Sequence, residues 1–413
     1  MAIITYSSFA DDGTDALEVW PPTSKLAFDS IVSDLKPSYT TKTVAQSDPD
    51  RRQQAKVRVA EHGNEHDVIP KVQRALILHG LRQPYQLTHG HAVPTTLAIN
   101  EMTVRILAIG LNPVDWNMSD LKEGDIVLCA STDYRDMRKA AFQEYAIALE
   151  HNVCKLPKHV SVAQGAAIGV AYVAAGLALG VCLGLRLPAF GSAQHLDLRA
   201  LVRSLPPKEI PADVRAECLQ SLEEDQRPQS GDWIAIWGGS STSALFLAQL
   251  ARLAGLKIIL VVDVAKHGRR LSTMGWSYLV DSQHPDRAVE VIRGITGGQL
   301  RYGIDVVGPK TSSCLARCLA KGSQAQAHLV ALAALPKEPA ADGVVYHSVP
   351  MKLFHEVPSV GRALMTWLEH ALEASAVILP EVTSVKGGLS GVNPALDEMR
   401  SGAVSGRRLV VRL

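Results

Sequence analysis

The stretch of this chain best suited to chemistry is a turn rich in glycine and hydroxyl groups, within WIAIWGGSSTSALFLAQL (233–250). An apolar run that predicts a buried strand precedes it, and an amphipathic run that predicts a helix follows it. Such a turn points backbone N–H groups and the positive end of a helix at a phosphate. The alternative is a turn with a purely structural role. The residues expected to bind a dinucleotide here are Gly238, Gly239, Ser240, Ser241, Thr242 and Ser243.

The segments around this turn alternate between short apolar runs and amphipathic runs. That alternation predicts βαβ units and a parallel sheet, because each crossover helix returns the chain to the same edge. We therefore expect a Rossmann cofactor domain over residues 165–340, interrupted by an insertion at 186–230 with a helix near 210–225. Strands are expected at 233–237, 257–263, 278–281, 304–308 and 327–335, with helices at 243–255, 268–275, 285–298 and 311–322.

The end of the second strand carries signals for two different cofactors. Asp263 is an acidic residue of the kind that binds the ribose 2′-hydroxyl of NADH. Lys266 and Arg270 follow closely, and cationic side chains suit the 2′-phosphate of NADPH. These basic residues also fit the solvated face of a short helix. NADPH is the favoured cofactor and NADH is the alternative.

The segments on either side predict a second, mostly β domain. Apolar runs at 71–80, 102–112, 126–130 and 142–149 read as strands, and the chain closes with a strand at 407–413. The part at 70–164 is therefore expected to be mostly β, and the part at 341–413 to be of mixed structure that ends in a strand. Residues 1–69 are polar and charged, which favours an irregular extension.

Composition excludes several classes of protein. The 413 residues carry a formal net charge of +1, so there is no excess charge to attract nucleic acid or an anionic membrane. The N-terminal sequence has no basic region followed by an apolar run, so no signal peptide is expected and the protein is expected to be cytoplasmic. The uncharged segment 165–185 is long enough to span a bilayer, yet its flanks favour a buried helix.

The cysteines give no sign of a metal site. The chain has six, none in a CxxC pair, and no histidine stands at the spacing of a ligand beside Cys314 and Cys318, which lie four residues apart. Zinc sites need several N, S or O ligands close together. We therefore expect reduced, buried thiols and no bound metal.

Taken together, these motifs resemble the medium-chain dehydrogenase/reductase superfamily. The resemblance is closest to its zinc-independent, enoyl-reductase-like branch, which includes trans-acting enoyl reductases of fungal polyketide pathways. It covers roughly residues 71–413. The motifs are NPVDW (112–116), AFQEYAIA (141–148), WGGSSTSA (237–244), IDVVG (304–308), HSVPMKLF (347–354) and SGRRLVV (405–411). It implies an α/β fold, with a GroES-like β-rich catalytic domain, here shortened and built from residues 70–164 and 341–413, around a Rossmann domain.

The resemblance also implies an activity. Such enzymes transfer a hydride from NADPH, without zinc, to an activated C=C or C=O. The substrate would be a polyketide-like intermediate of secondary metabolism, free or carrier-bound, and the enzyme a monomer or homodimer. Tyr172 is the candidate proton donor, although a core aromatic with a satisfied hydroxyl is the alternative. Asn112 is a second candidate catalytic residue, Asp115, Trp116 and Asn117 are expected to border the nicotinamide and substrate, and Gly308 and Arg407 to contact the cofactor.

Three departures from the family pattern leave other functions open. Asn117 stands where the group often has lysine, and Ala174 where relatives often have threonine. A long segment that normally follows NPVDW is missing after Asp120, through either a gene-model defect or a reshaped, wider pocket. The alternatives to a reductase are a redox-silent cyclase or isomerase, working as a pericyclase or lyase would, and a non-catalytic partner of a synthase.

Overall fold

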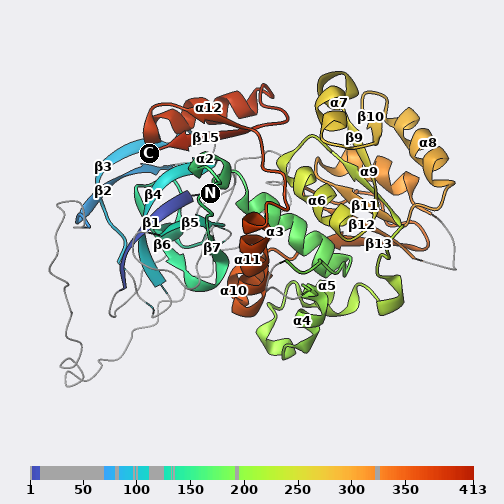
Figure 1. Cartoon of the computed structure of the whole chain (residues 1–413), viewed down its shortest axis with the longest axis horizontal. Helices are drawn as coiled ribbons and strands as arrows, with labels where there is room; N and C mark the ends of the chain where they lie inside the picture. The colour runs from blue at the N-terminus through green and yellow to red at the C-terminus, as the bar shows by residue number, and fades with distance from the viewer. Residues whose placement is uncertain are drawn as a thin grey trace.

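The computed structural model describes residues 2–9, 69–79, 83–95, 98, 101–110, 125–131, 133, 135–190, 195–320 and 326–413. They form a β-rich lobe and an α/β lobe, with helices α3 (Gly169–Leu177) and α11 (Pro358–Glu373) between them (Figure 1). Helix α3 packs on α6 of the α/β lobe, whereas α11 packs on β7 of the β-rich lobe. These two helices therefore connect the lobes.

The α/β lobe is built on a six-stranded parallel sheet of order β10-β9-β8-β11-β12-β13. Its order reverses between β8 and β11, and ligands of such sheets bind at that switch point. The strands are β8 (Trp233–Trp237), β9 (Lys257–Val262), β10 (Tyr278–Asp281), β11 (Tyr302–Asp305), β12 (Ala327–Ala331) and β13 (Val344–Ser348). The crossover helices are α6 (Thr242–Leu253), α7 (Val264–Thr273), α8 (Pro285–Thr296) and α9 (Pro309–Cys318).

Every strand and helix expected here is present, and the parallel Rossmann sheet is confirmed. One boundary differs from the expectation. Strand β13 pairs with β12 in parallel, so the Rossmann sheet continues past residue 340, where the catalytic domain was expected to resume. The sequence VVYHS gives a weak strand signal because it contains the polar residues Tyr346 and His347. In the structure this segment forms the edge strand of the sheet.

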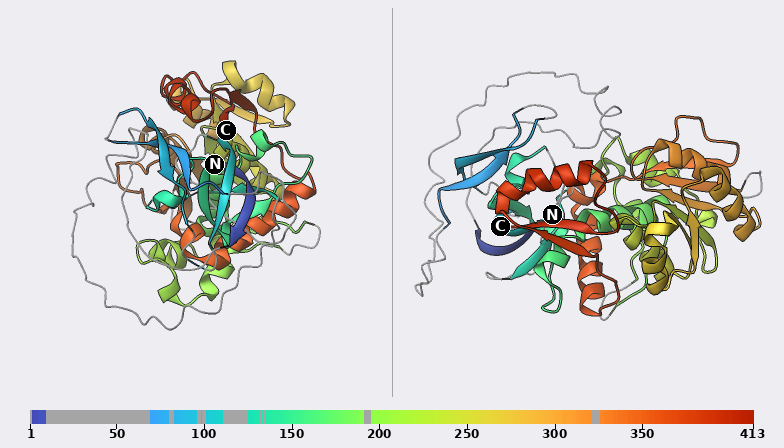
Figure 2. Two further views of the ribbon diagram at one scale, coloured as in Figure 1. Left: turned by 90° about the vertical axis from the view of Figure 1, so that its left-hand side faces the viewer. Right: turned by 90° about the horizontal axis from the view of Figure 1, so that it is seen from above.

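The β-rich lobe contains a seven-stranded sheet of order β14-β15-β4-β1-β5-β7, with β6 also paired to β4. Strand β15 runs antiparallel to β4, so the C-terminal strand lies beside the N-terminal ones (Figure 2). A separate hairpin joins β2 (Val72–Ile77) to β3 (Gln86–Ala92). The sheet strands are β1 (Ala2–Phe9), β4 (Glu101–Gly110), β5 (Ile126–Cys129), β6 (Tyr145–Leu149), β7 (Val153–Lys155), β14 (Val382–Val385) and β15 (Arg408–Arg412).

Strand β1 departs from the sequence expectation. Residues 1–69 were expected to form an irregular extension, yet β1 pairs with both β4 and β5 in the middle of the sheet. The sequence AIITYSSF is short and lies next to a polar segment, so its apolar residues give only a weak strand signal. A central position in this sheet means that β1 supplies hydrogen bonds to two neighbouring strands.

The uncharged segment 165–185 folds as consecutive short helices. These are α2 (Val162–Gly165), α3 and a π-helical turn η5 (Ala178–Cys182), and residues 171–183 are almost fully buried. Among the described residues no helix has both the length and the apolar character needed to cross a membrane.

The remaining helices complete the fold. The insertion contains α4 (Leu198–Ser204) and α5 (Arg215–Gln220), which lie beside the end of α3 (Figure 1). The later part of the chain forms α10 (Lys352–Glu356), α11 and α12 (Val392–Arg400). Short 3₁₀ turns are η3 (Met137–Lys139), η4 (Glu150–Asn152), η6 (Pro207–Glu209), η7 (Glu224–Gln226) and η8 (Gly388–Gly391).

Candidate functional site

The glycine turn after β8 is confined between two neighbouring strands. A Cβ on Gly239 would lie 2.8 Å from the side chains of Leu260 and Val262 on β9. A Cβ on Gly238 would lie 2.6 Å from Val306 and Val307 after β11, and the φ of Gly238 is +88°. Both positions therefore require glycine, because a side chain would push the turn away from the sheet.

The polar groups of the turn have two roles: some fix its conformation, and others face outward. The amides of Gly238 and Gly239 both donate to the carbonyl of Val261, at 3.1 and 3.0 Å. Ser241 is the N-cap of α6, and its Oγ accepts from the Ala244 amide at 3.1 Å. The glycines and Ser241 thus shape the turn. The first-turn amides of α6, at Thr242 and Ser243, are positioned as donors to an anion because a helix gives its first amides no internal partner.

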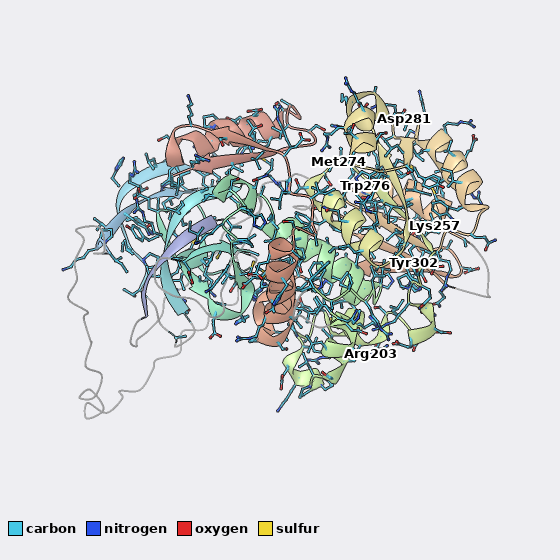
Figure 3. The ribbon with its side chains drawn as sticks, in the orientation of Figure 1. Arg203, Lys257, Met274, Trp276, Asp281 and Tyr302 are labelled. Carbon is cyan, nitrogen blue, oxygen red and sulfur yellow. The ribbon has the colours of Figure 1, made fainter. Side chains whose placement is uncertain are left out.

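A cavity of about 170 Å³ adjoins the turn. The turn contributes four of the predicted binding residues to its wall, and α7 contributes a fifth, Arg270. Met274 and Trp276 close it beside α6 and α7 (Figure 3). Other wall residues come from α6, β9 and α7, and the C-terminal part of the chain contributes 378–381 and Gly406. The residues lining the cavity include Gly239, Ser240, Ser241, Thr242, Arg270 and Glu381. The structure therefore brings the glycine turn and one predicted cation together.

Arg270 is half-buried at this cavity. Its guanidinium lies 3.6 Å from the carboxylate of Glu381, which is itself largely exposed. A Cβ on Gly406 would lie 2.9 Å from the Nη2 of Arg270, so the C-terminal segment supports the arginine from one side. Such an exposed, long ion pair is weak, and an anion in the cavity competes for the guanidinium readily.

Asp263 and Lys266 are engaged with each other. The Asp263 carboxylate caps α7 by accepting from the Lys266 amide at 3.0 Å, and it accepts from Gln283 Nε2 at 2.9 Å. The Lys266 ammonium pairs with the same carboxylate at 2.9 Å. Hydrogen bonds from Lys266 lower the pKa of Asp263. The carboxylate therefore remains charged but is partly neutralised by its own helix.

Gly308 and Arg407 lie outside the cavity wall. The Gly308 amide donates to the Asp305 carboxylate at 2.7 Å, at the carboxyl end of β11. Asp305 is fully buried, burial raises its pKa, and its Oδ2 has no hydrogen-bond partner within the described chain. Arg407 is half-exposed and lies 3.6 Å from Glu398. The IDVVG motif is visible in the sequence, but the buried carboxylate that orders it was not predicted.

Tyr172 lies in the hydrophobic core. Its side chain is fully buried and its hydroxyl donates to the Leu364 carbonyl at 2.8 Å. The ring stacks on Trp367, with centroids 6.1 Å apart, and meets Phe246 edge-on. These contacts do not agree with a hydroxyl that faces the cofactor, and burial raises the pKa of Tyr172 well above its usual range. The alternative of a core aromatic with a satisfied hydroxyl fits instead.

The predicted substrate-side residues lie outside the described residues. These are Asn112, Asp115, Trp116 and Asn117. The other residue near the expected nicotinamide, Ala174, lies on α3 and is 8% exposed.

Comparisons with known proteins agree with this geometry. No family model matches the chain. A zinc-type alcohol dehydrogenase-like protein of Schizosaccharomyces pombe is 23% identical over 359 residues, which cover 76% of this chain and 92% of the relative. A trans-enoyl reductase of Thermothelomyces thermophilus is 23% identical over 396 residues, covering 83% of this chain and 97% of the relative. A solved alcohol dehydrogenase superfamily protein of Novosphingobium aromaticivorans shares the fold, with a TM-score of 0.60 and 12% identity, over 83% of this chain and 99% of its own.

The chain is similar in sequence to proteins of the medium-chain dehydrogenase/reductase type and shares the fold of that superfamily. Other relatives are also named trans-enoyl reductases, and one is named the enoyl reductase component of the lovastatin nonaketide synthase of Aspergillus terreus. The enoyl-reductase-like branch expected from the sequence is therefore confirmed, and these relatives and structural neighbours are oxidoreductases of this superfamily.

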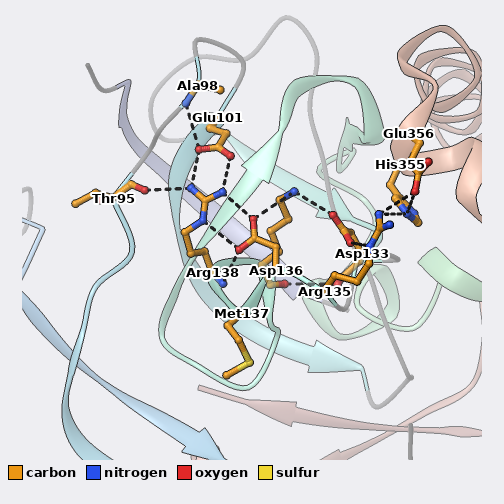
Figure 4. Close-up of polar contacts among 12 residues, drawn as sticks. Thr95, Ala98, Glu101, Asp133, Arg135, Asp136, Met137, Arg138, His355 and Glu356 are labelled. Carbon is orange, nitrogen blue, oxygen red and sulfur yellow. Dashed lines mark hydrogen bonds and ion pairs between the residues drawn. The ribbon is translucent and has the colours of Figure 1, made fainter. Parts of the chain in front are cut away.

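In this chain a network of charged side chains links the β-rich lobe to α10 (Figure 4). Arg138 pairs with Glu101 and Asp136, at 2.9 and 2.7 Å. Arg135 pairs with Asp133 in the β-rich lobe and with Glu356 on α10, both at 2.9 Å. No sequence motif predicts this network, because Arg135 and Glu356 come from segments more than 200 residues apart.

The structure also groups three side chains that could bind a metal. They are Cys182, Glu217 and His347, whose potential ligand atoms all lie within 4.8 Å of one another. Local spacing in the sequence predicted no clustered ligands. It does not reveal this group, because the three residues come from η5, α5 and β13.

Proposed function

We propose that this protein is an NADPH-dependent reductase of an α,β-unsaturated carbonyl in a polyketide-like intermediate of secondary metabolism. The observation that carries the proposal is the glycine turn, whose cavity also holds Arg270. Its relatives support the substrate class, because several are named trans-enoyl reductases. The substrate is a small molecule, either free or attached to a carrier.

The turn fits a pyrophosphate for a physical reason. A Cβ on Gly238 or Gly239 would meet β9 or the loop after β11, so the two glycines let the turn lie close to the sheet and fix where α6 begins. The amides at the start of α6 add donors and a positive partial charge. When a dinucleotide is bound it supplies the hydride, and this chain's contribution is to bind and orient it.

Two features of the site favour a 2′-phosphate over a free ribose hydroxyl. The Asp263 carboxylate, which would repel a phosphate, already accepts hydrogen bonds from Lys266 and Gln283. Arg270 is held by one long ion pair, so its guanidinium can turn to a phosphate at low cost. The pair of cations at 266 and 270 therefore outweighs the acidic residue.

A second candidate function is a redox-silent cyclisation or isomerisation. It is favoured by Tyr172, whose hydroxyl is occupied by the Leu364 carbonyl instead of serving as a proton donor. A reaction without net hydride transfer needs no such donor beside the cofactor.

One comparison separates the two functions. The purified chain is incubated with an α,β-unsaturated thioester, with and without NADPH, and product is followed by mass spectrometry alongside NADPH absorbance. A reductase forms saturated product only with NADPH and consumes it in equal amount. Product that forms at the same rate without NADPH would support the redox-silent function.

A further inference from the structure

The cluster of Cys182, Glu217 and His347 lies where the insertion meets the Rossmann sheet. Cys182 ends the η5 turn, Glu217 lies on the insertion helix α5, and His347 lies on the edge strand β13. The Cys182 and His347 side chains are fully buried, and the Glu217 side chain is 15% exposed. Three distant segments therefore converge on one small volume.

The geometry points to a zinc site at this cluster, with Cys182, Glu217 and His347 as ligands. Thiolate sulfur, imidazole nitrogen and carboxylate oxygen are the three ligand types that zinc accepts. Zinc–ligand distances of about 2.0–2.3 Å place tetrahedral ligand atoms roughly 3.3–3.8 Å apart. Glu217 Oε1 and His347 Nδ1 are now 2.8 Å apart, and all three ligand atoms lie within 4.8 Å. Shifts of about 1 Å or less therefore suffice to admit the ion.

Neighbouring groups hold two of the ligands in place. The Nε2 of His347 lies 3.0 Å from the Nδ1 of His328, a fully buried residue on β12. The ring of Tyr302 stacks on His328, with centroids 6.0 Å apart. The Ser221 hydroxyl donates to Glu217 Oε1 at 3.0 Å. Metal-binding histidines and carboxylates in proteins are usually fixed by such second partners.

The protons of the site can be accounted for. In the metal-free site the Cys182 sulfur is written as a thiol, which carries one proton. Zinc binding releases that proton to solvent, and a sulfur–zinc bond forms. Zinc on His347 Nδ1 displaces the hydrogen from that nitrogen, so Nε2 carries the proton and donates to His328. The thiolate and the Glu217 carboxylate together balance the two positive charges of the ion.

A buried cation supports the thiolate. Arg199, on α4, is fully buried and donates to the carbonyls of Val181 and Leu222, at 2.8 and 2.6 Å. Through its bond to the Val181 carbonyl, Arg199 holds a positive charge next to Cys182 in the chain. The partly exposed face of Glu217 leaves a side on which water can reach the site and complete the coordination.

Such a site would clamp the insertion to the cofactor domain. Helix α5 meets the Rossmann sheet at this cluster, where Glu217 lies 2.8 Å from His347 on β13. Metal bound between α5 and β13 links them directly. This role is independent of the proposed reductase activity, and its test does not use a substrate.

The test measures metal binding by the full-length chain. Protein stripped with a chelator is titrated with Zn²⁺ against a chromophoric chelator, and zinc retained after dialysis is measured by mass spectrometry. A Co²⁺-loaded sample is examined for the near-ultraviolet band of a sulfur–cobalt bond. We expect equimolar zinc, a cobalt–thiolate band and release of a proton on binding.

Variants identify the ligands. Cys182→Ser removes the cobalt–thiolate band, whereas Cys129→Ser, a buried cysteine in the other lobe, leaves it unchanged. His328→Asn weakens zinc binding by about 10–100-fold, the usual effect of losing an outer partner. A folded wild-type chain that retains no zinc and shows no cobalt–thiolate band overturns the proposal, and the cluster is then a metal-free hydrogen-bond network. A band that survives Cys182→Ser overturns it equally. The wild-type result decides the proposal even if a variant does not fold.

Discussion

Arg270 and Gly406 lie against each other at the edge of the phosphate turn, although 136 residues separate them in sequence (406 − 270). A Cβ on Gly406 would lie 2.9 Å from the guanidinium Nη2 of Arg270, and the φ of Gly406 is +72°. The C-terminal segment thus sets the position of a cation that belongs to the cofactor domain. This contact gives the cofactor site a support outside the Rossmann domain.

Gly406→Ala is expected to weaken NADPH binding by pushing Arg270 aside. Losing one charge-assisted hydrogen bond costs about 1.5 kcal/mol, which is roughly tenfold in Kd. Gly402→Ala is the matched control, because Gly402 has a similar φ of +76° and a Cβ added there would meet no atom within 4 Å. Both variants carry about 1–2 kcal/mol of backbone strain. Equal Kd values for the two variants, from NADPH fluorescence titration, would show that Arg270 is not positioned by Gly406.

Arg270→Gln is expected to discriminate between the two cofactors. A guanidinium on the 2′-phosphate is worth about 1.5–3 kcal/mol, so the Kd for NADPH should rise by roughly 10–150-fold while the Kd for NADH changes little. Arg269→Gln, at an exposed position on the same helix, should leave both affinities unchanged. The account is contradicted if Arg270→Gln weakens NADPH and NADH equally, since the arginine would then not face the 2′-phosphate.

Tyr172→Phe separates a core role from a catalytic one. The substitution removes the hydroxyl that donates to Leu364, which should lower the free energy of unfolding by about 1 kcal/mol. The rate of NADPH consumption should stay within a factor of two. Denaturant unfolding and steady-state rates measure the two quantities. A large loss of rate with unchanged stability would restore Tyr172 as a proton donor.

His355 should make stability depend on pH. Burial lowers the pKa of His355 to about 4, whereas the unfolded chain keeps a value near 6.5. The unfolded state therefore binds a proton first as pH falls, so the stability is full above about pH 6.5 and is lost between 6.5 and 4. His355→Gln should reduce the slope between pH 6.5 and 5 by up to about 1.4 kcal/mol per pH unit. Denaturant titrations at several pH values measure it, and an unchanged slope would contradict the lowered pKa.

The sequence predicted the parts of this fold that are encoded locally. Strand β8, the turn and helix α6 follow one another directly, so their pattern is readable without the rest of the chain. Strand β1 was missed because its place in the sheet depends on β4 and β5, which begin 92 and 117 residues after β1 ends (101 − 9 and 126 − 9). The fate of Tyr172 likewise depends on Leu364, across 192 residues.

The candidate site likewise combines features that the sequence predicted with features that depend on distant segments. Sequence motifs identified the phosphate turn and Arg270, but not Gly406 as the support of that arginine. The cluster of Cys182, Glu217 and His347 has no signature in local spacing, because only the folded chain brings it together. Contacts between distant segments therefore determine the parts of the site that local sequence patterns do not predict.

The central claim is that the chain delivers a hydride from NADPH to its substrate. The most direct measurement uses NADPH with deuterium at the transferable position and an α,β-unsaturated thioester, with the product analysed by mass spectrometry. Hydride transfer from NADPH should give one deuterium per product molecule, at the β-carbon, and should give product in an amount equal to the cofactor consumed. Product that forms without deuterium, or as fast when NADPH is left out, would contradict it.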